Sequence, residues 1–211
     1  MDPQPPPGSM FYGRTEDDPD GVVYMRTCRN GEGGTPVYTY FTAADGADVP
    51  AVDPVALAQQ AVSKMRLSGP AIASPRANGS YVVGMPIWLW VNQTPTTYGP
   101  QTTSASAGGV TVSATATVTS ISWDMGDGSS AVVCDGPGTK YDPSVGKARS
   151  PDCGHVYDKA SANQVGSKFT VAATATWTVD WQVDGGGEVG QFTEIRQSQE
   201  QVPIGEVQVV R

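Results

Sequence analysis

The chain has 211 residues, of which 38% are hydrophobic and only 16% charged, and its formal net charge at pH 7 is −8. This negative balance argues against binding to nucleic acid or to anionic lipid surfaces, since both need a Lys/Arg-rich footprint. No run approaches the ~18 apolar residues of a membrane span, so membrane insertion is not expected. The abundance of Thr, Ser, Ala, Val and Gly predicts a mostly β protein.

The first 20 residues are rich in proline and acidic residues and are expected to be a disordered or linker-like N-terminus. They lack the basic-then-apolar layout of a signal peptide. Residues 22–28 and 36–41 have the β-branched and aromatic content of strands, and Asn-Gly and Gly-Gly turn signals lie between them. A hairpin is therefore predicted.

One helix is predicted to begin at Asp53, which can cap the first turn, with Pro54 at a position where a missing N–H costs little. Gly69-Pro70 marks its end. Apolar residues recur at three- and four-residue steps and form one stripe, made of Val55, Ala58, Val62 and Met65. This stripe is expected to pack on a small sheet.

Residues 70–75 and 81–91 are predicted strands, and the second is apolar on both faces, as in a strand buried on both sides. The segment 93–100 contains two prolines and a glycine, which interrupt regular pairing. It is the predicted boundary between a small α+β domain, residues 21–95, and a second domain, residues 96–211.

Apolar and polar residues alternate strictly over 110–118, and over 169–183 the apolar odd-numbered residues alternate with mostly Thr and Asp, which predicts half-buried strands with one wet face. The phase slips at Thr119-Ser120, where a turn, bend or bulge is expected. After a Gly-rich loop, residues 191–211 alternate again, so a long antiparallel hairpin closes the domain.

Three spaced motifs resemble the pattern of the PKD (polycystic kidney disease) domain: Trp123–Ser129 (WDMGDGS), His155-Val156-Tyr157 and Phe169-Thr170-Val171. The resemblance covers about half of the chain and implies a PKD/immunoglobulin-like β-sandwich. Met125 replaces the usual Phe, and a long insertion separates the first two motifs. We expect the insertion and His155 to fold back over the Trp123–Ser129 turn.

The whole chain also resembles secreted actinobacterial proteins often labelled "ATP/GTP-binding protein". The resemblance lies in 71–76, 87–91, 134–139, 150–155 and 204–208. It implies secretion, but the nucleotide label finds no support in the residues. Gly146-Lys147 is followed by Ala148 and lacks the preceding Gly of a phosphate-binding loop.

Asp124 and Asp127 are candidate calcium ligands, with Asp135, Asp142 or Asp152 as further oxygen donors. The favoured interpretation is structural, because short Asp side chains beside glycines accept hydrogen bonds from their own turn. His155 is the only histidine, so a general base near neutral pH would have to be this residue. A structural hydrogen bond is favoured for it, and no cofactor is expected.

Cys134 and Cys153 flank a turn-rich loop, and their pairing as a disulfide would indicate an oxidising, extracellular compartment. Cys28 is left unpaired. It could be a buried thiol, a link between two chains, or the partner of a cysteine in a segment outside this chain, which is the favoured alternative.

Aromatic residues gather in the first half of the chain. Trp88, Trp90, Tyr81, Tyr38 and Tyr40 could form a platform for a glycan, although core packing is the favoured interpretation. Trp177 and Trp181 share one face of their strand and are expected in the sandwich core.

Together these features predict a non-enzymatic, secreted or cell-surface structural or adhesion module that contacts protein or carbohydrate. An edge strand near Gly205–Arg211 could add it to a surface assembly or filament through β-pairing. The oligomeric state stays open. The first alternative is a hydrolase accessory or cryptic enzyme that uses the Asp-rich turn and His155, and the second is a nucleotide-binding protein.

Overall fold

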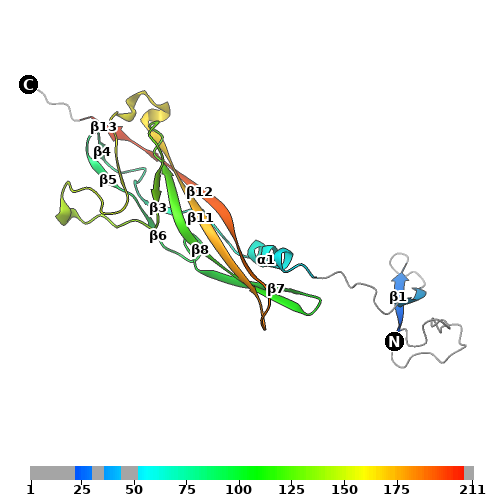
Figure 1. The fold of residues 1–211 in the computed structure, drawn as a ribbon. Helices are drawn as coiled ribbons and strands as arrows, with labels where there is room; N and C mark the ends of the chain where they lie inside the picture. The colour runs from blue at the N-terminus through cyan, green and yellow to red at the C-terminus, as the bar shows by residue number, and fades with distance from the viewer. Residues whose placement is uncertain (1–21, 30–35, 44–51, 207–211) are drawn as a thin grey trace, which may run out of the picture. The chain divides into compact units, whose positions relative to one another are not determined.

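The computed structural model describes residues 22–29, 36–43 and 52–206, and the chain divides into two compact units, 1–51 and 52–211 (Figure 1). In the first unit, β1 (Val22–Arg29) and β2 (Pro36–Ala43) form the predicted antiparallel hairpin, in which Val22 lies opposite Ala43. The expected linker, residues 1–20, lies outside the described residues.

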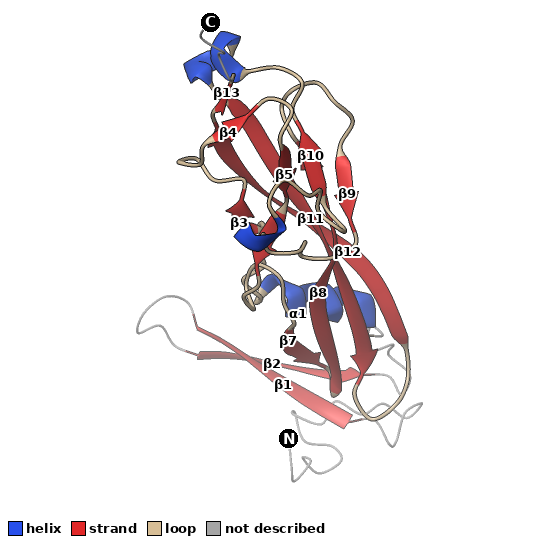
Figure 2. Cartoon of the chain, turned by 90° about the vertical axis from the view of Figure 1, so that its left-hand side faces the viewer, coloured by secondary structure: helices blue, strands red, loops and turns tan. Residues whose placement is uncertain are grey.

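The second unit is built on a long antiparallel sheet with the strand order β12-β11-β8-β7 (Figure 2). Its strands are β7 (Gln101–Ala107), β8 (Val110–Asp124), β11 (Phe169–Val183) and β12 (Val189–Val202), and the short β9 (Val132–Cys134) also pairs with β8. The predicted alternation is confirmed, since seven successive odd-numbered residues of β11, Phe169 to Trp181, are buried. One face of the sheet therefore lines the core.

The phase slip at Thr119-Ser120 is a β-bulge inside one continuous strand. Ser120 lies opposite Thr176 and Val118 lies opposite Trp177, so Thr119 is the extra residue. Because a bulge adds one residue on one strand, the apolar side chains switch from even to odd positions and stay on the same face.

Shorter elements complete the core. They are α1 (Pro54–Ser63), β3 (Ala71–Ser74) with β6 (Trp90–Asn92), β5 (Pro86–Trp88) with β10 (Gly154–Val156), and β4 (Tyr81–Val82) in parallel with β13 (Ile204–Gly205). Three 3₁₀ turns lie at Pro143–Val145, Ser161–Asn163 and Val165–Ser167. Buried residues of α1, β5, β6 and the long sheet form one cluster, so the fold is mostly β and sandwich-like, with one α-helix in the described part of the chain.

The predicted domain boundary near residue 95 differs from the structure, in which residues 52–95 belong to the same compact unit as the long sheet. β5 pairs with β10, which is more than 60 residues away in the sequence, and β4 pairs with β13, which is more than 120 residues away. The short strands of 71–92 cannot bury their apolar side chains alone, so they complete the core of the long sheet. The Pro-rich segment 93–100 is only a turn within this unit.

The helix begins as predicted, because Asp53 accepts a hydrogen bond from the backbone N–H of Val55 at 2.9 Å. Its buried face differs in part from the predicted stripe: Val55 is 42% exposed, and the buried residues are Leu57, Ala58, Ala61 and Val62. The helix packs on β7, β8 and β11 rather than on a small sheet, and it ends at Ser63. No helix of the described segments is long and apolar enough to cross a membrane.

Candidate functional site

The turn after β8 holds both predicted aspartates by local hydrogen bonds. Asp124 accepts from the N–H of Gly126, and Asp127 accepts from the N–H of Ser129, each at 2.9 Å. Gly126 has φ +74°, and a Cβ there would lie 2.5 Å from the carbonyl oxygen of Thr170. The favoured structural role of these aspartates agrees with this geometry.

His155 lies against this turn, as expected. Its Nε2 is 2.8 Å from Oδ2 of Asp127, and both side chains are only 11% exposed. Two residues on, the buried Tyr157 donates a hydrogen bond to the carbonyl oxygen of Met125 at 2.9 Å and stacks on Phe169. Burial raises the pKa of Tyr157, so its hydroxyl stays a donor. The His-x-Tyr motif thus ties β10 to the turn after β8.

The candidate calcium ligands do not converge. Asp142 caps the 3₁₀ turn at Ser144, and Asp152 accepts hydrogen bonds from Thr139, Ser150 and Cys153. Within residues 52–206, no three His, Cys, Asp or Glu side chains are grouped closely enough to hold a metal ion. Among the described residues, no hydrogen bond joins Asp135 to the Asp124–Asp127 turn.

The Asp127–His155 contact predicts an acid-dependent loss of stability. Burial alone raises the pKa of Asp127, but hydrogen bonds from Ser129 and His155 and the charge of His155 outweigh it, so the pKa is lowered. A carboxyl with a lowered pKa in the folded state stabilises the fold above its unfolded pKa of about 4, and this contribution is lost as the pH falls through the folded value. Asp127→Asn should therefore cost stability at pH 7 and progressively less below pH ~4. Urea unfolding of both proteins at pH 7 and pH 3 measures this gap, and an equal gap at both pH values would contradict the assignment.

Cys134 and Cys153 form the predicted disulfide, with their Cα atoms 5.9 Å apart and both side chains buried. The loop that they close was expected to fold back over the Trp123–Ser129 turn. The structure differs, because the loop makes its hydrogen bonds elsewhere. Instead the backbone N–H of Val91 donates to Pro137, that of Leu89 donates to Cys153, and the Trp88 indole donates to Ala148. This disulfide loop, residues 135–152, therefore packs on the segment that contains β5 and β6.

The outward face of the long sheet is almost entirely neutral and polar. We define this polar face by the residues that alternate with the buried ones, and they are Thr102 and Ser104 of β7, Thr111, Ser113, Thr115 and Thr117 of β8, Thr174, Thr176, Thr178, Asp180 and Gln182 of β11, and Gln191, Thr193, Ile195, Gln197, Gln199 and Gln201 of β12. Hydroxyl and carboxamide groups dominate it, so it offers many hydrogen-bond donors and acceptors with little net charge.

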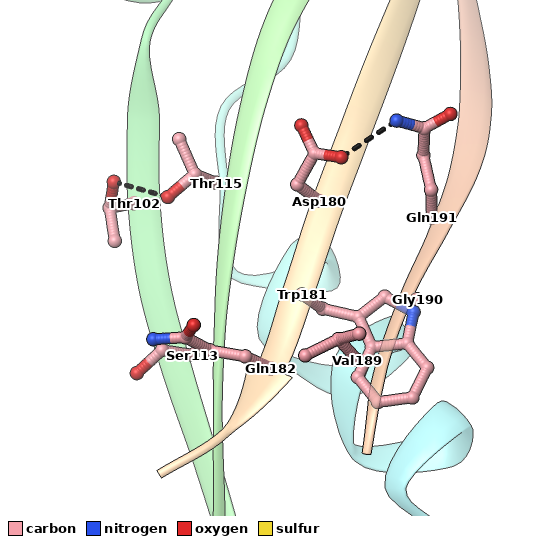
Figure 3. A pocket seen from close by; sticks show the side chains of 9 residues that line it. All are labelled: Thr102, Ser113, Thr115, Asp180, Trp181, Gln182, Val189, Gly190 and Gln191. Atoms are coloured by element: carbon pink, nitrogen blue, oxygen red, sulfur yellow. Dashed lines mark hydrogen bonds between the residues drawn. The ribbon is translucent and has the colours of Figure 1, made fainter. Parts of the chain in front are cut away.

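Four residues of the polar face form one row across four strands, Gln191, Asp180, Thr115 and Thr102 (Figure 3). Gln191 donates to Asp180 at 2.7 Å, and the hydroxyls of Thr102 and Thr115 are 2.9 Å apart. The row lies in an open hollow of about 610 Å³ that Ser113 and Gln182 also line. Two hydrogen-bonded pairs thus hold exposed oxygen and nitrogen atoms in fixed positions.

A glycine shapes one side of this hollow. Gly190 lies opposite Trp181, whose indole extends across β12 from the buried face of the sheet (Figure 3). A Cβ on Gly190 would lie 2.5 Å from the indole ring, so only glycine lets the ring take this position. The tryptophan supports the strand that carries Gln191.

The row was not predicted as a site, because sequence reasoning assigned function to loops and edges. The signal was present in the polar residues at every second position of 111–117 and 174–182, which include Thr115 and Asp180. Of the other candidates, Tyr81, Trp88 and Trp90 line a separate cavity, whereas the side chains of Cys28, Tyr38 and Tyr40 lie outside the described residues. The expected edge at Gly205–Arg211 differs in part: Ile204–Gly205 pairs with β4, residues 207–211 are outside the description, and β12 is an outer strand of the long sheet.

Comparison with known proteins adds no assignment to this geometry. No protein-family model, curated protein or solved structure matches the chain.

Proposed function

We propose that the chain is a non-enzymatic, secreted or cell-surface module with a PKD-like sandwich, and that it contacts neutral carbohydrate through the part of the polar face that forms the hollow around Gln191 and Asp180. The observation that carries the proposal is the row Gln191, Asp180, Thr115 and Thr102 in the hollow of about 610 Å³. A sugar polymer presents hydroxyl groups that both donate and accept hydrogen bonds, and the row offers both kinds of partner.

Composition favours carbohydrate over protein as the partner of this face. Protein interfaces have cores rich in aromatic and aliphatic side chains. Among the described outward residues of the long sheet, the large apolar ones are Ile195, Val189 and Val133, which are 55%, 74% and 65% exposed. Ile195 and Val189 lie on the outer strand β12 and Val133 lies on the short β9, so none of them lies on the central strands β8 and β11. A polyhydroxylated ligand does not need an apolar core, because it can exchange its water for hydroxyl and amide partners.

The disulfide supports the proposed compartment. Disulfides persist in oxidising environments and are rare where thiols are kept reduced. The Cys134–Cys153 bridge closes an exposed loop, which suits a protein that works outside the cell.

A hydrolase-like role for Asp127 and His155 has less support, although the two side chains do meet. Asp127 uses one oxygen for Ser129 and the other for His155. Nε2 of His155 is engaged by Asp127, so Nδ1 would have to serve as the general base. Among the described residues no hydroxyl group is hydrogen-bonded to His155 that it could activate, and its ring packs edge-on against Tyr157.

Replacement of Gln191 by alanine tests the polar face. A hydrogen bond from this side chain contributes about 1 kcal/mol to the binding free energy. Its loss should therefore weaken retention on an insoluble neutral polysaccharide, such as a β-glucan, roughly fivefold. Gln201→Ala is the matched control, because Gln201 also lies outward on β12 and donates to one β11 side chain, Thr170. Ten residues of strand, about 33 Å, separate the two glutamines. Equal retention of both variants, or no retention of the unmodified protein, would overturn the proposal.

A further inference from the structure

A second cavity lies between β5 and the disulfide loop, away from the residues of the polar face. It has a volume of about 160 Å³. Aromatic side chains from two distant parts of the chain line it, together with one cation, and we call it the aromatic hollow: Tyr81, Trp88, Trp90, Tyr141 and Arg76. Three of these aromatic residues were candidates for a glycan platform in the sequence, whereas Tyr141 comes from the disulfide loop.

The walls of the aromatic hollow are fixed by hydrogen bonds. The Trp88 indole N–H donates to the carbonyl oxygen of Ala148 at 2.8 Å, and Trp88 packs edge-on against Tyr141 at a ring distance of 5.5 Å. The Tyr141 hydroxyl donates to Gly146 at 2.8 Å. A ligand therefore meets rings that are already ordered, which lowers the entropic cost of binding.

Polar groups at the hollow remain available to a ligand. The Tyr81 hydroxyl accepts a hydrogen bond from the backbone N–H of Arg76 at 2.9 Å, which leaves its own proton free to be donated. Arg76 is exposed, and among the described residues no carboxylate lies within ion-pairing distance of its guanidinium. In a protein with a net charge of −8, this arginine is a local positive group beside an aromatic wall.

The combination defines the chemistry of the ligand. The C–H groups of a pyranose carry partial positive charge and pack on the negative faces of aromatic rings. A guanidinium pairs with a carboxylate through two parallel hydrogen bonds. We propose that the aromatic hollow binds a single uronic acid residue, with its ring against the aromatic side chains and its carboxylate on Arg76.

The size of the hollow agrees with one sugar ring. The volume of about 160 Å³ is roughly tenfold the 10–15 Å³ that a single bound water molecule needs, so the hollow is much larger than a water site. This space suits a terminal sugar ring or a side-branch residue, whereas an oligosaccharide would extend beyond it. The aromatic hollow and the hollow of the polar face share no lining residue, so a substitution in one removes no contact from the other.

Titration of the whole chain with free glucuronate, followed by tryptophan fluorescence, tests the proposal, with glucose as the uncharged analogue. Trp88 and Trp90 border the ligand, so glucuronate should change the emission in a saturable way and glucose should bind at least tenfold more weakly. Arg76→Gln should weaken glucuronate binding roughly tenfold or more, as expected for a hydrogen bond between charged groups. Arg76→Lys should restore only part of the affinity, because an ammonium lacks the planar fork of the guanidinium.

Arg149→Gln is the matched control, because Arg149 is also exposed and lines a neighbouring cavity beside Pro86 and Ile87. It makes the same change in net charge. An equal loss in Arg76→Gln and Arg149→Gln would show general charge attraction and overturn the proposal, as would equal binding of glucose and glucuronate or no saturable change. Gln191→Ala should leave glucuronate binding unchanged, so failure at the aromatic hollow is distinguishable from failure at the polar face.

Discussion

Replacing Cys134 and Cys153 together by serine is expected to lower the free energy of unfolding of the second unit by about 3 kcal/mol. The bridge spans 19 residues of sequence, and in the chain-entropy model a loop of this length restricts the unfolded chain by about that amount. The folded state loses order as well, because the disulfide loop fixes Trp88 through its indole hydrogen bond to Ala148.

Denaturant unfolding with and without reductant measures this effect, and the double variant should match the reduced protein. Cys28→Ser is the control, because it removes a thiol in the first unit and leaves the bridge intact. An unfolding midpoint that reductant leaves unchanged would contradict the assigned role of the disulfide.

Trp177→Ala is expected to cost the fold about 3–5 kcal/mol, since a buried tryptophan leaves a large cavity when it is truncated. Trp177 is fully buried, and its indole N–H donates to the carbonyl oxygen of Ser68 at 3.2 Å. It also packs so closely on Gly99 that a Cβ there would lie 3.1 Å from the indole ring. Trp177 therefore joins the long sheet to the segment that precedes β3, through Ser68, and to the segment that precedes β7, through Gly99.

Thr176→Ala is the matched control, because Thr176 is the preceding residue of β11 but lies on the polar face. Its substitution should change the free energy of unfolding by less than ~1 kcal/mol. Urea unfolding of both variants measures the difference. Similar losses of unfolding free energy in the two variants would contradict the assignment of Trp177 to the buried face of β11 and of Thr176 to its polar face.

The long sheet could be predicted from the sequence, because a period of two is a local property of each strand. The alternation over 169–183 gave the bounds of β11, and the slip at Thr119-Ser120 gave the bulge. The helix start was predictable for the same reason, since Asp53 acts on a residue two positions away.

Non-local pairing was beyond such reasoning. The contact of β5 with β10 joins segments that are separated by more than 60 residues, and the sequence pattern of 81–92 does not identify which strand it will meet. The Pro-rich stretch 93–100 therefore resembles a domain boundary when only the sequence is considered. A wet strand face also looks alike whether it meets water or a ligand, so the row of Gln191, Asp180 and Thr115 emerged only when the register placed these residues side by side.

The hydrogen bonds of the Asp124–Asp127 turn were foreseen, because they are local. The contact between Asp127 and His155 spans 28 residues, and only the resemblance to the PKD pattern suggested that His155 would return to this region. The aromatic hollow shows the same limit, since Tyr141 joins Tyr81 and Trp88 through the path of the disulfide loop.

Carbohydrate contact through the polar face is tested most directly by nuclear magnetic resonance of the isotope-labelled chain during titration with a soluble neutral glucan oligosaccharide. The account predicts that the largest shifts occur at the side-chain amides of Gln191 and Gln182 and at the backbone amides of Thr115 and Asp180, while Gln201 stays unchanged. Shifts confined to other parts of the molecule, or none at saturating oligosaccharide, would contradict it.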